Sequence, residues 1–195
     1  MAEAVRGYFG SNYRGIEITY VENRRYAETN NLYSLWMAKD ELDDDILLIE
    51  GDLIFDGALL QELVQSQQQN VAVVARYQQS MDGTVILASN GLAESMVLKA
   101  KQEPGFDYGP ALKTVNIYKL SHEGLAGSVI PEMDNYVMQN QTGQYYEAVF
   151  ADLIGSGRLK MAVLDAGNRR WAEIDTLSDL SAAEKMFAAA PVTTI

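Results

Sequence analysis

The 195 residues combine an ordinary apolar content of 48% with an acidic excess, giving a formal net charge of −12 and a pI near 4.4. This length suits one domain with a substantial core, and the negative charge disfavours nucleic acid and anionic membranes as partners. The sequence has no cysteine and a single histidine, His122, which excludes disulfides, thiolate metal sites and histidine-based metal sites.

In the first half of the chain, apolar residues switch repeatedly between helical and strand spacing. The spacing predicts a helix over 2–9, a strand over 16–21, a helix capped by Thr29, Asn30 or Asn31, a strand over 46–49, a helix over 57–67 and a strand over 71–75. Such alternation favours a three-layer αβα fold around a mixed, mainly parallel sheet.

The second half has an α+β pattern. We expect a hairpin of 84–88 and 95–101 around Asn90-Gly91, a loop over 102–112, a strand over 115–120, a helix over 145–154, a strand over 159–164 and a helix over 177–187. No linker divides the chain, so residues 1–195 are predicted to form one domain. No apolar stretch reaches the ~18 residues of a membrane span, and the N-terminus lacks a signal-peptide pattern. A cytoplasmic protein is expected.

The first candidate site follows the apolar run Ile46–Ile49, which ends in Glu50-Gly51-Asp52. A strand covered on both faces loses its polar alternation, so this run is typical of a buried strand in a parallel sheet. Ligands of such sheets bind beyond the carboxyl ends of the strands. Asp52 would lie there, either as a ligand of Mg²⁺ or as a cap of the turn into the next helix.

A second acidic segment is Trp171-Ala172-Glu173-Ile174-Asp175. If the segment is extended, Trp171, Glu173 and Asp175 share one side, because side chains alternate along a strand. Neighbouring buried carboxylates raise each other's pKa unless a cation is present. A divalent metal or a cationic substrate group would fit between them, although Asp175 could equally cap the last helix.

Other polar groups stand at Asp82, at Lys113 and Asn116, and at Tyr145-Tyr146-Glu147. Lys113 could meet a phosphate as a point charge, or it could be a solvated strand end. Two tyrosines beside a carboxylate can enclose an ammonium group through cation–π attraction, or they can pack against the sheet.

Taken together, these motifs resemble the nucleotidyltransferase family of the nucleotide-diphospho-sugar transferase fold, and most closely its CTP:phosphocholine and 2-aminoethylphosphonate cytidylyltransferases. The resembling segments follow the family's order over nearly the whole chain: Tyr26–Leu35, Glu50–Phe55, Met81–Thr84, Lys113–Tyr118, Tyr145–Glu147 and Trp171–Asp175.

The resemblance implies transfer of a nucleotidyl, and most readily a cytidylyl, group from a nucleoside triphosphate to a small phosphorylated amine, with release of pyrophosphate. It implies Mg²⁺ on Asp52 and Asp175, a phosphate contact for Lys113, and an ammonium pocket. The ammonium pocket would include Tyr146, Glu147 and Glu173. Further residues of the same motifs are assigned to the substrate (Tyr145, Trp171, Asp82 and Asn116) and to the nucleotide (Asn30, Asn31 and Gly51). The oligomeric state is left open.

The sequence departs from the family in one respect, because the family opens with a strand and a glycine-rich loop that hold the triphosphate. Neither is found in these 195 residues. Convergent N–H groups of such a loop are hard to replace, so we expect a truncated domain with little activity on its own. The alternatives are a sugar-1-phosphate nucleotidyltransferase on the same scaffold and a non-catalytic ligand-binding remnant.

Overall fold

A mixed sheet lies at the centre of the computed structural model, which describes residues 2–188. Its strand order is β3-β8-β5-β9-β7-β6, with an additional pairing of β8 and β6. The strands are β3 (Ile46–Ile49), β5 (Val71–Arg76), β6 (Val85–Ser89), β7 (Leu92–Val97), β8 (Leu112–Leu120) and β9 (Ala162–Asp165).

The strand directions explain why the sheet is mixed. Strands β3, β5, β6 and β9 run in one direction, while β8 and β7 run the opposite way and lie between them. Among the described strands, only β5 and β9 are therefore paired in parallel. The expected three layers and mixed sheet are found, but direct neighbours are mainly antiparallel, because the long strand β8 pairs with β3, β5 and β6.

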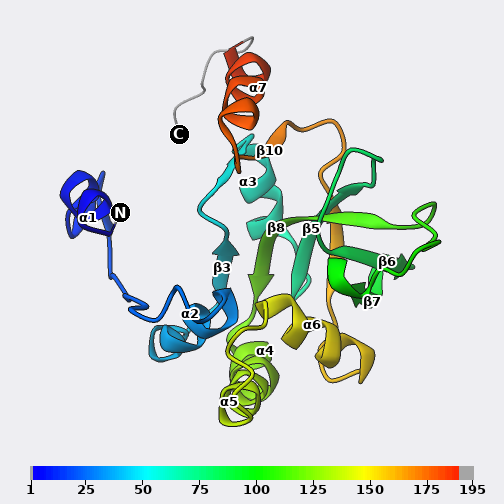
Figure 1. The fold of residues 1–195 in the computed structure, drawn as a ribbon, viewed down its shortest axis with the longest axis horizontal. Helices are drawn as coiled ribbons and strands as arrows, with labels where there is room; N and C mark the ends of the chain where they lie inside the picture. The colour runs from blue at the N-terminus through cyan, green and yellow to red at the C-terminus, as the bar shows by residue number, and fades with distance from the viewer. Residues whose placement is uncertain (1, 189–195) are drawn as a thin grey trace.

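Helices cover both faces of this sheet (Figure 1). On one face, α2 (Asn31–Met37), α5 (Ile130–Met138) and α6 (Tyr146–Gly155) bury Leu32, Met133 and Phe150 against Ala72 and Tyr118. On the other face, α3 (Ala58–Gln65) packs against the alternate residues of the same strands through Leu59 and Leu63. This alternation follows from the period of two along a strand.

A separate two-stranded ladder joins distant parts of the chain. Strand β4 (Leu53–Phe55) pairs antiparallel with β10 (Trp171–Glu173), so that Leu53 lies opposite Glu173. The final helix α7 (Leu177–Ala188) follows β10. This ladder brings the two acidic segments identified in the sequence to the same place.

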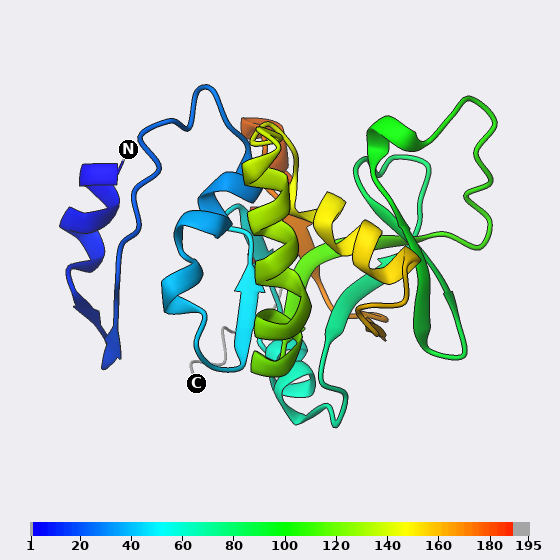
Figure 2. The same ribbon diagram turned by 90° about the horizontal axis from the view of Figure 1, so that it is seen from below.

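The N-terminal segment stands apart from the body in both views (Figures 1 and 2). It consists of α1 (Ala2–Phe9) and a short hairpin of β1 (Asn12–Tyr13) and β2 (Ile16–Glu17). The predicted strand over 16–21 is shorter than expected, because its alternating residues pair only with this local hairpin. No helix within residues 2–188 is long and apolar enough to cross a lipid bilayer.

The sequence indicated a helix start at His122, after Ser121, but not the extent of the helical segment that follows. After the cap Ser121, the chain forms α4 (His122–Gly124), the π-helical turn η3 (Leu125–Val129) and α5 without a break in helical backbone conformation. Gly124 and Pro131 have low helix propensity, so the residue spacing did not indicate a helix over this segment. Gly124 is needed for packing, since a Cβ there would lie 2.6 Å from Asn70 Oδ1. Two short 3-10 turns complete the fold, η1 (Lys39–Glu41) and η2 (Lys99–Lys101).

Several element boundaries differ from those predicted, and two of them show why. Strand β7 begins at Leu92, immediately after the turn residues Asn90 and Gly91, which both have positive φ as expected. Strand β8 begins at Leu112 rather than Val115, because its polar first residues pair with β5 and β6. Pairing partners, which sequence spacing does not reveal, decide both boundaries.

Leu153 on α6 is fully buried, so Leu153→Ala should lower the free energy of unfolding by about 2 to 5 kcal/mol through lost burial and the cavity it leaves. Leu177→Ala on α7 is the matched control, because that side chain is 82% exposed and its loss should change stability by less than ~0.5 kcal/mol. Urea denaturation measures both variants. Equal effects would contradict the core described here.

Candidate active site

A cleft of about 1110 Å³ opens where β3 ends, between β8, β10 and the first turn of α6. Most of the residues predicted from the sequence line it: Asn31, Gly51, Asp52, Asp82, Lys113, Asn116, Tyr145, Tyr146, Glu147, Glu173 and Asp175. Glu50 and Thr84 line it as well. The fold therefore gathers side chains from six separate sequence motifs into one site.

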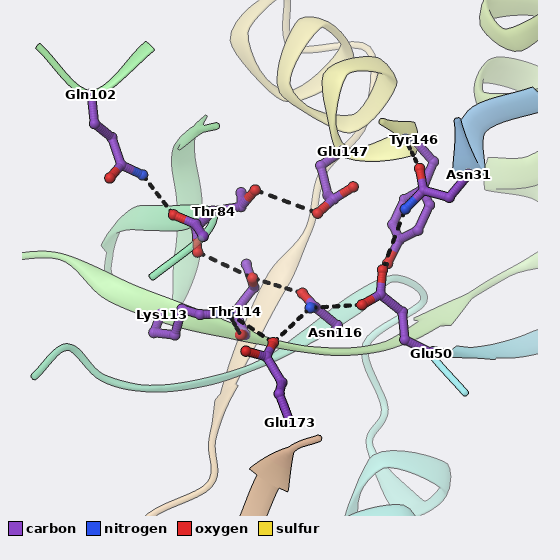
Figure 3. Close-up of polar contacts among 11 residues, drawn as sticks. Asn31, Glu50, Thr84, Gln102, Lys113, Thr114, Asn116, Tyr146, Glu147 and Glu173 are labelled. Carbon is purple, nitrogen blue, oxygen red and sulfur yellow. Dashed lines mark hydrogen bonds and ion pairs between the residues drawn. The ribbon is translucent and has the colours of Figure 1, made fainter. Parts of the chain in front are cut away.

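The Asn116 side chain links the two walls of this cleft (Figure 3). Its Nδ2 donates to Glu50 Oε2 at 2.9 Å and to Glu173 Oε1 at 2.9 Å, while its Oδ1 accepts from Thr114 Oγ1 at 2.8 Å. Glu50 follows β3, and Glu173 ends β10. The amide of Asn116 thus fixes the separation of two carboxylates from distant elements.

Asn116 also has an unusual backbone, with a φ of +59° in the middle of a buried strand. Between the pairs Ala72–Tyr118 and Val74–Thr114, β8 contains more residues than β5, which defines a bulge around Asn116. Bulges turn a side chain away from regular alternation and are common beside active sites. Asparagine tolerates the left-handed region better than most residues, so its presence here is consistent with the bulge.

Lys113 is 2% exposed and lies at the base of the cleft, which excludes the solvated strand end as its role. Its Nζ donates to Glu173 Oε1 at 3.0 Å and to Thr114 O at 2.8 Å. Gly83, with a φ of +102°, passes close by, and a Cβ there would lie 3.2 Å from the same ammonium. An ammonium has three donors, so one remains for a ligand.

The charges lining the cleft do not balance. Lys113 pairs with Glu173, and Lys99 pairs with Asp82 at 2.6 Å. Within residues 2–188, the other carboxylates of the cleft have no cationic partner: Glu50, Asp52, Glu147 and Asp175. A cleft with this excess of carboxylates attracts cations.

Of these unpaired carboxylates, Glu147 is buried and Glu50 is half-buried, and the loss of solvent shifts the pKa of both. Burial raises the pKa of Glu147, and the nearby charge of Glu50 adds to the effect. Burial likewise raises the pKa of Glu50, with further increases from Asp52 and Glu173, while hydrogen bonds from Tyr146 and Asn116 oppose the shift. Both directions follow from the penalty for burying an uncompensated charge.

The other two, Asp52 and Asp175, are exposed at the mouth of the cleft. A backbone hydrogen bond of 2.9 Å from Ile174 N to Asp52 O ties their segments together. The capping role considered for Asp175 belongs to Thr176 and Asp179, which bond reciprocally at the start of α7. Asp52 is not a helix cap, because it precedes strand β4.

Within the described part of the chain, neither carboxylate is held by another side chain, and two free carboxylates suit a hard divalent cation. No group of three or more histidine, cysteine or acidic side chains in residues 2–188 could hold a metal by itself. A metal bound here would need further ligands from water or substrate, as Mg²⁺ commonly has.

The sequence is 31% identical over 188 residues to the CMP-5'-(3-aminopropyl)phosphonate synthase of Streptomyces rubellomurinus. The alignment covers 96% of this chain, which spans about 30% of the length of that curated relative. No family model matches the sequence.

Solved structures show the fold. A Bacillus anthracis protein assigned as a glucose-1-phosphate thymidylyltransferase has a TM-score of 0.71 at 15% identity, covering 98% of this chain and 74% of that chain. The CTP:phosphocholine cytidylyltransferase of Streptococcus pneumoniae has a TM-score of 0.69 at 15% identity, covering 94% and 72%. The chain has the nucleotidyltransferase fold. The fold class and the family resemblance predicted from the sequence are confirmed.

Two of the predicted site residues lie elsewhere in this nucleotidyltransferase fold. Asn30 is the N-cap of α2, with its side chain accepting from Asn31 N at 2.8 Å, and it does not line the cleft. Trp171 lines a neighbouring cleft of about 660 Å³, which shares Lys113, Glu173 and Asp175 with the larger one. Its ring packs beside the core under α3.

Tyr146 and Asn31 position another side chain of the site, Glu50, through hydrogen bonds. The Tyr146 hydroxyl donates to Glu50 Oε1 at 2.8 Å, and its ring packs against Tyr118 and Phe150. The Asn31 side chain accepts from Tyr146 N at 2.9 Å and donates to Glu50 Oε1 at 3.4 Å. Both residues hold Glu50 in place. Their binding roles stay predictions.

Glu50, Thr84 and Thr114 were not assigned to the site from the sequence. Glu50 stands directly after an apolar strand, which is the signal that identified Asp52, so the same reasoning could have included it. Thr84 donates to Glu147 Oε1 at 3.4 Å, and Thr114 donates to Asn116. Both threonines lie in segments that resemble the family, Met81–Thr84 and Lys113–Tyr118, but neither was given a role in the site.

Because burial raises the pKa of Glu147, the folded chain binds more protons than the unfolded chain between the two pKa values. The contribution of Glu147 to stability is therefore most favourable at low pH and becomes less favourable as pH rises through the folded pKa. We expect Glu147→Gln to be more stable than the parent at neutral pH by roughly 1 to 3 kcal/mol. The difference should vanish below about pH 4.

Chemical denaturation across this pH range measures the effect. The control is Glu94→Gln on β7, an exposed residue whose replacement should change stability by less than ~0.5 kcal/mol at every pH. A pH-independent effect of Glu147→Gln would contradict the electrostatic origin.

Proposed function

We propose that the chain forms the metal and acceptor side of a site that transfers a cytidylyl group from CTP to a small phosphorylated amine or aminophosphonate, releasing pyrophosphate. The observation that carries this proposal is the cleft whose carboxylates exceed its lysines. Of the four carboxylates without a lysine partner within residues 2–188, Asp52 and Asp175 are exposed, Glu50 is half-buried and Glu147 is buried. The relatives support it. One is named for a CMP-linked aminophosphonate product, and another for CTP and phosphocholine.

The chemistry requires positioning of anions and involves no covalent enzyme intermediate. An oxygen of the acceptor's phosphate or phosphonate forms a bond to the α-phosphorus of CTP, and the bond from that phosphorus to pyrophosphate breaks. Lys113, oriented by Glu173 and Thr114, directs its remaining donor at a phosphate oxygen. Mg²⁺ held by Asp52 and Asp175 would add positive charge where the reacting phosphates gather.

Two alternative functions are a sugar-1-phosphate nucleotidyltransferase and a ligand-binding domain without turnover. A sugar-1-phosphate acceptor is consistent with the fold of the Bacillus anthracis protein. Neutral hydroxyls would leave Glu50 and Glu147 uncompensated, however, so the charge balance favours an amine. A ligand-binding domain without turnover is the other alternative, because the 195 residues contain no glycine-rich loop to hold a triphosphate.

Removal of one metal ligand should weaken metal binding without unfolding the chain. Asp52→Asn and Asp175→Asn should each weaken Mn²⁺ binding, followed by water proton relaxation, by at least about tenfold, or 1.4 kcal/mol. Asp179→Asn is the control. It removes a carboxylate that caps α7, so it should lower stability by about 1 kcal/mol and leave Mn²⁺ affinity unchanged. Equal metal affinity in all three variants would contradict the assignment.

The acceptor class and the turnover of this chain can be measured together. Calorimetric titration should show binding of 2-aminoethylphosphonate in preference to glucose 1-phosphate by about tenfold or more. Pyrophosphate release from CTP should be far below a typical enzyme rate of ~1 s⁻¹, since the triphosphate lacks donors to orient it. Tighter binding of the sugar phosphate would overturn the acceptor assignment, and rapid turnover would show that another segment binds the triphosphate.

A further inference from the structure

The further inference rests on the proposed function and concerns the two unpaired carboxylates inside the cleft, Glu50 and Glu147. Glu147, in the first turn of α6, is only 6% exposed. Its Oε1 accepts a long hydrogen bond of 3.4 Å from Thr84 Oγ1, and its Oε2 is buried without any hydrogen-bond partner in residues 2–188. A buried polar atom without a partner costs free energy, so this oxygen is a vacant acceptor position beside the cleft.

Within residues 2–188, Glu50 accepts hydrogen bonds only from neutral groups. Its donors are the Tyr146 hydroxyl at 2.8 Å, Asn116 Nδ2 at 2.9 Å and Asn31 Nδ2 at 3.4 Å. Figure 3 shows these donors converging on its carboxylate from β8, α6 and α2. They hold the side chain rigidly, but they do not neutralise its charge. A cation placed at this carboxylate would remove the remaining penalty.

Glu173, which the family resemblance assigned to the ammonium pocket, is in a different electrostatic state. Its Oε1 already accepts from both Lys113 and Asn116, so its charge is compensated within the chain. A cationic ligand gains more beside an uncompensated carboxylate than beside one already paired with a lysine. The charge balance therefore moves the ammonium away from Glu173 and toward the inner carboxylates.

The surroundings of these carboxylates also distinguish a primary from a quaternary ammonium. A quaternary ammonium has no N–H group and is held by aromatic faces. The Tyr146 ring, however, is packed edge-to-face on Tyr118 and tilted on Phe150, with centroids 5.9 and 5.4 Å apart, and its hydroxyl is engaged by Glu50. Tyr145 is 52% exposed. The inner cleft offers oxygen acceptors, which suit the three N–H groups of a primary ammonium.

We infer that Glu50 and Glu147 are the specificity-determining residues for the acceptor, and that they bind a primary ammonium by charge-assisted hydrogen bonds while Glu173 serves as the counterion of Lys113. The acceptor class is thereby narrowed to primary aminoalkyl phosphonates and phosphates. The roles within the cleft follow from exposure, with the exposed aspartates at the mouth and the half-buried Glu50 and buried Glu147 facing the amine.

The experiment compares three ligands by isothermal titration calorimetry on the 195-residue chain. These are 2-aminoethylphosphonate, ethylphosphonate, which lacks the ammonium, and phosphocholine, whose ammonium is quaternary. The first should bind at least about tenfold more tightly than either of the others. Glu50→Gln and Glu147→Gln should each reduce the ratio of 2-aminoethylphosphonate to ethylphosphonate affinity by about tenfold, because the amide keeps the shape and removes the charge.

Glu173→Gln is the matched comparison, since it removes a carboxylate of the same cleft that Lys113 already neutralises. It should leave the affinity ratio unchanged, even if both phosphonates bind less tightly. A ratio that falls in Glu173→Gln and not in the other two variants, or a preference for phosphocholine, would overturn the inference while the proposed function stands. Failure of all three ligands to bind the parent chain would overturn the proposed function and the inference together.

Discussion

The site depends on one backbone constraint, the left-handed conformation of Asn116 in the middle of β8. A buried strand normally sends successive side chains to opposite faces, and a residue with positive φ inside it is strained. Here the bulge places an amide where it can bond carboxylates from both walls, Glu50 after β3 and Glu173 on β10. The pairing of β8 with β3, β5 and β6 supplies the rigidity that holds this conformation.

Around this amide, the carboxylates of the cleft differ in how far their charge is neutralised. Lysines neutralise Glu173 and Asp82, neutral donors surround Glu50, and Glu147 retains a free oxygen. In a medium of low dielectric, each uncompensated carboxylate strengthens the attraction for a cation. The chain thus contains unfavourable electrostatics in its unliganded state that a cationic substrate would relieve, which is how many binding sites gain selectivity at the expense of stability.

The sequence predicted the layers of the fold and most cleft residues, because apolar runs and the polar residues that end them are local signals. The strand before Glu50-Gly51-Asp52 and the turn at Asn90-Gly91 are examples. It did not predict which carboxylates are neutralised, since the contact between Lys113 and Glu173 spans distant segments. Nor did it predict how far the helix that starts at His122 extends, because Gly124 has a low helix propensity and is required there for packing against Asn70.

The ladder of β4 and β10 is a weakly held part of the fold. It joins Leu53 to Glu173 across more than half of the chain, yet consists of only three residue pairs outside the main sheet. With so few contacts outside the main sheet, such a ladder opens at a lower free energy than the sheet itself. Asp52 and Asp175 flank this ladder. A ligand that bridges them would stabilise the closed form, so that completion of the fold and occupancy of the site belong to a single equilibrium.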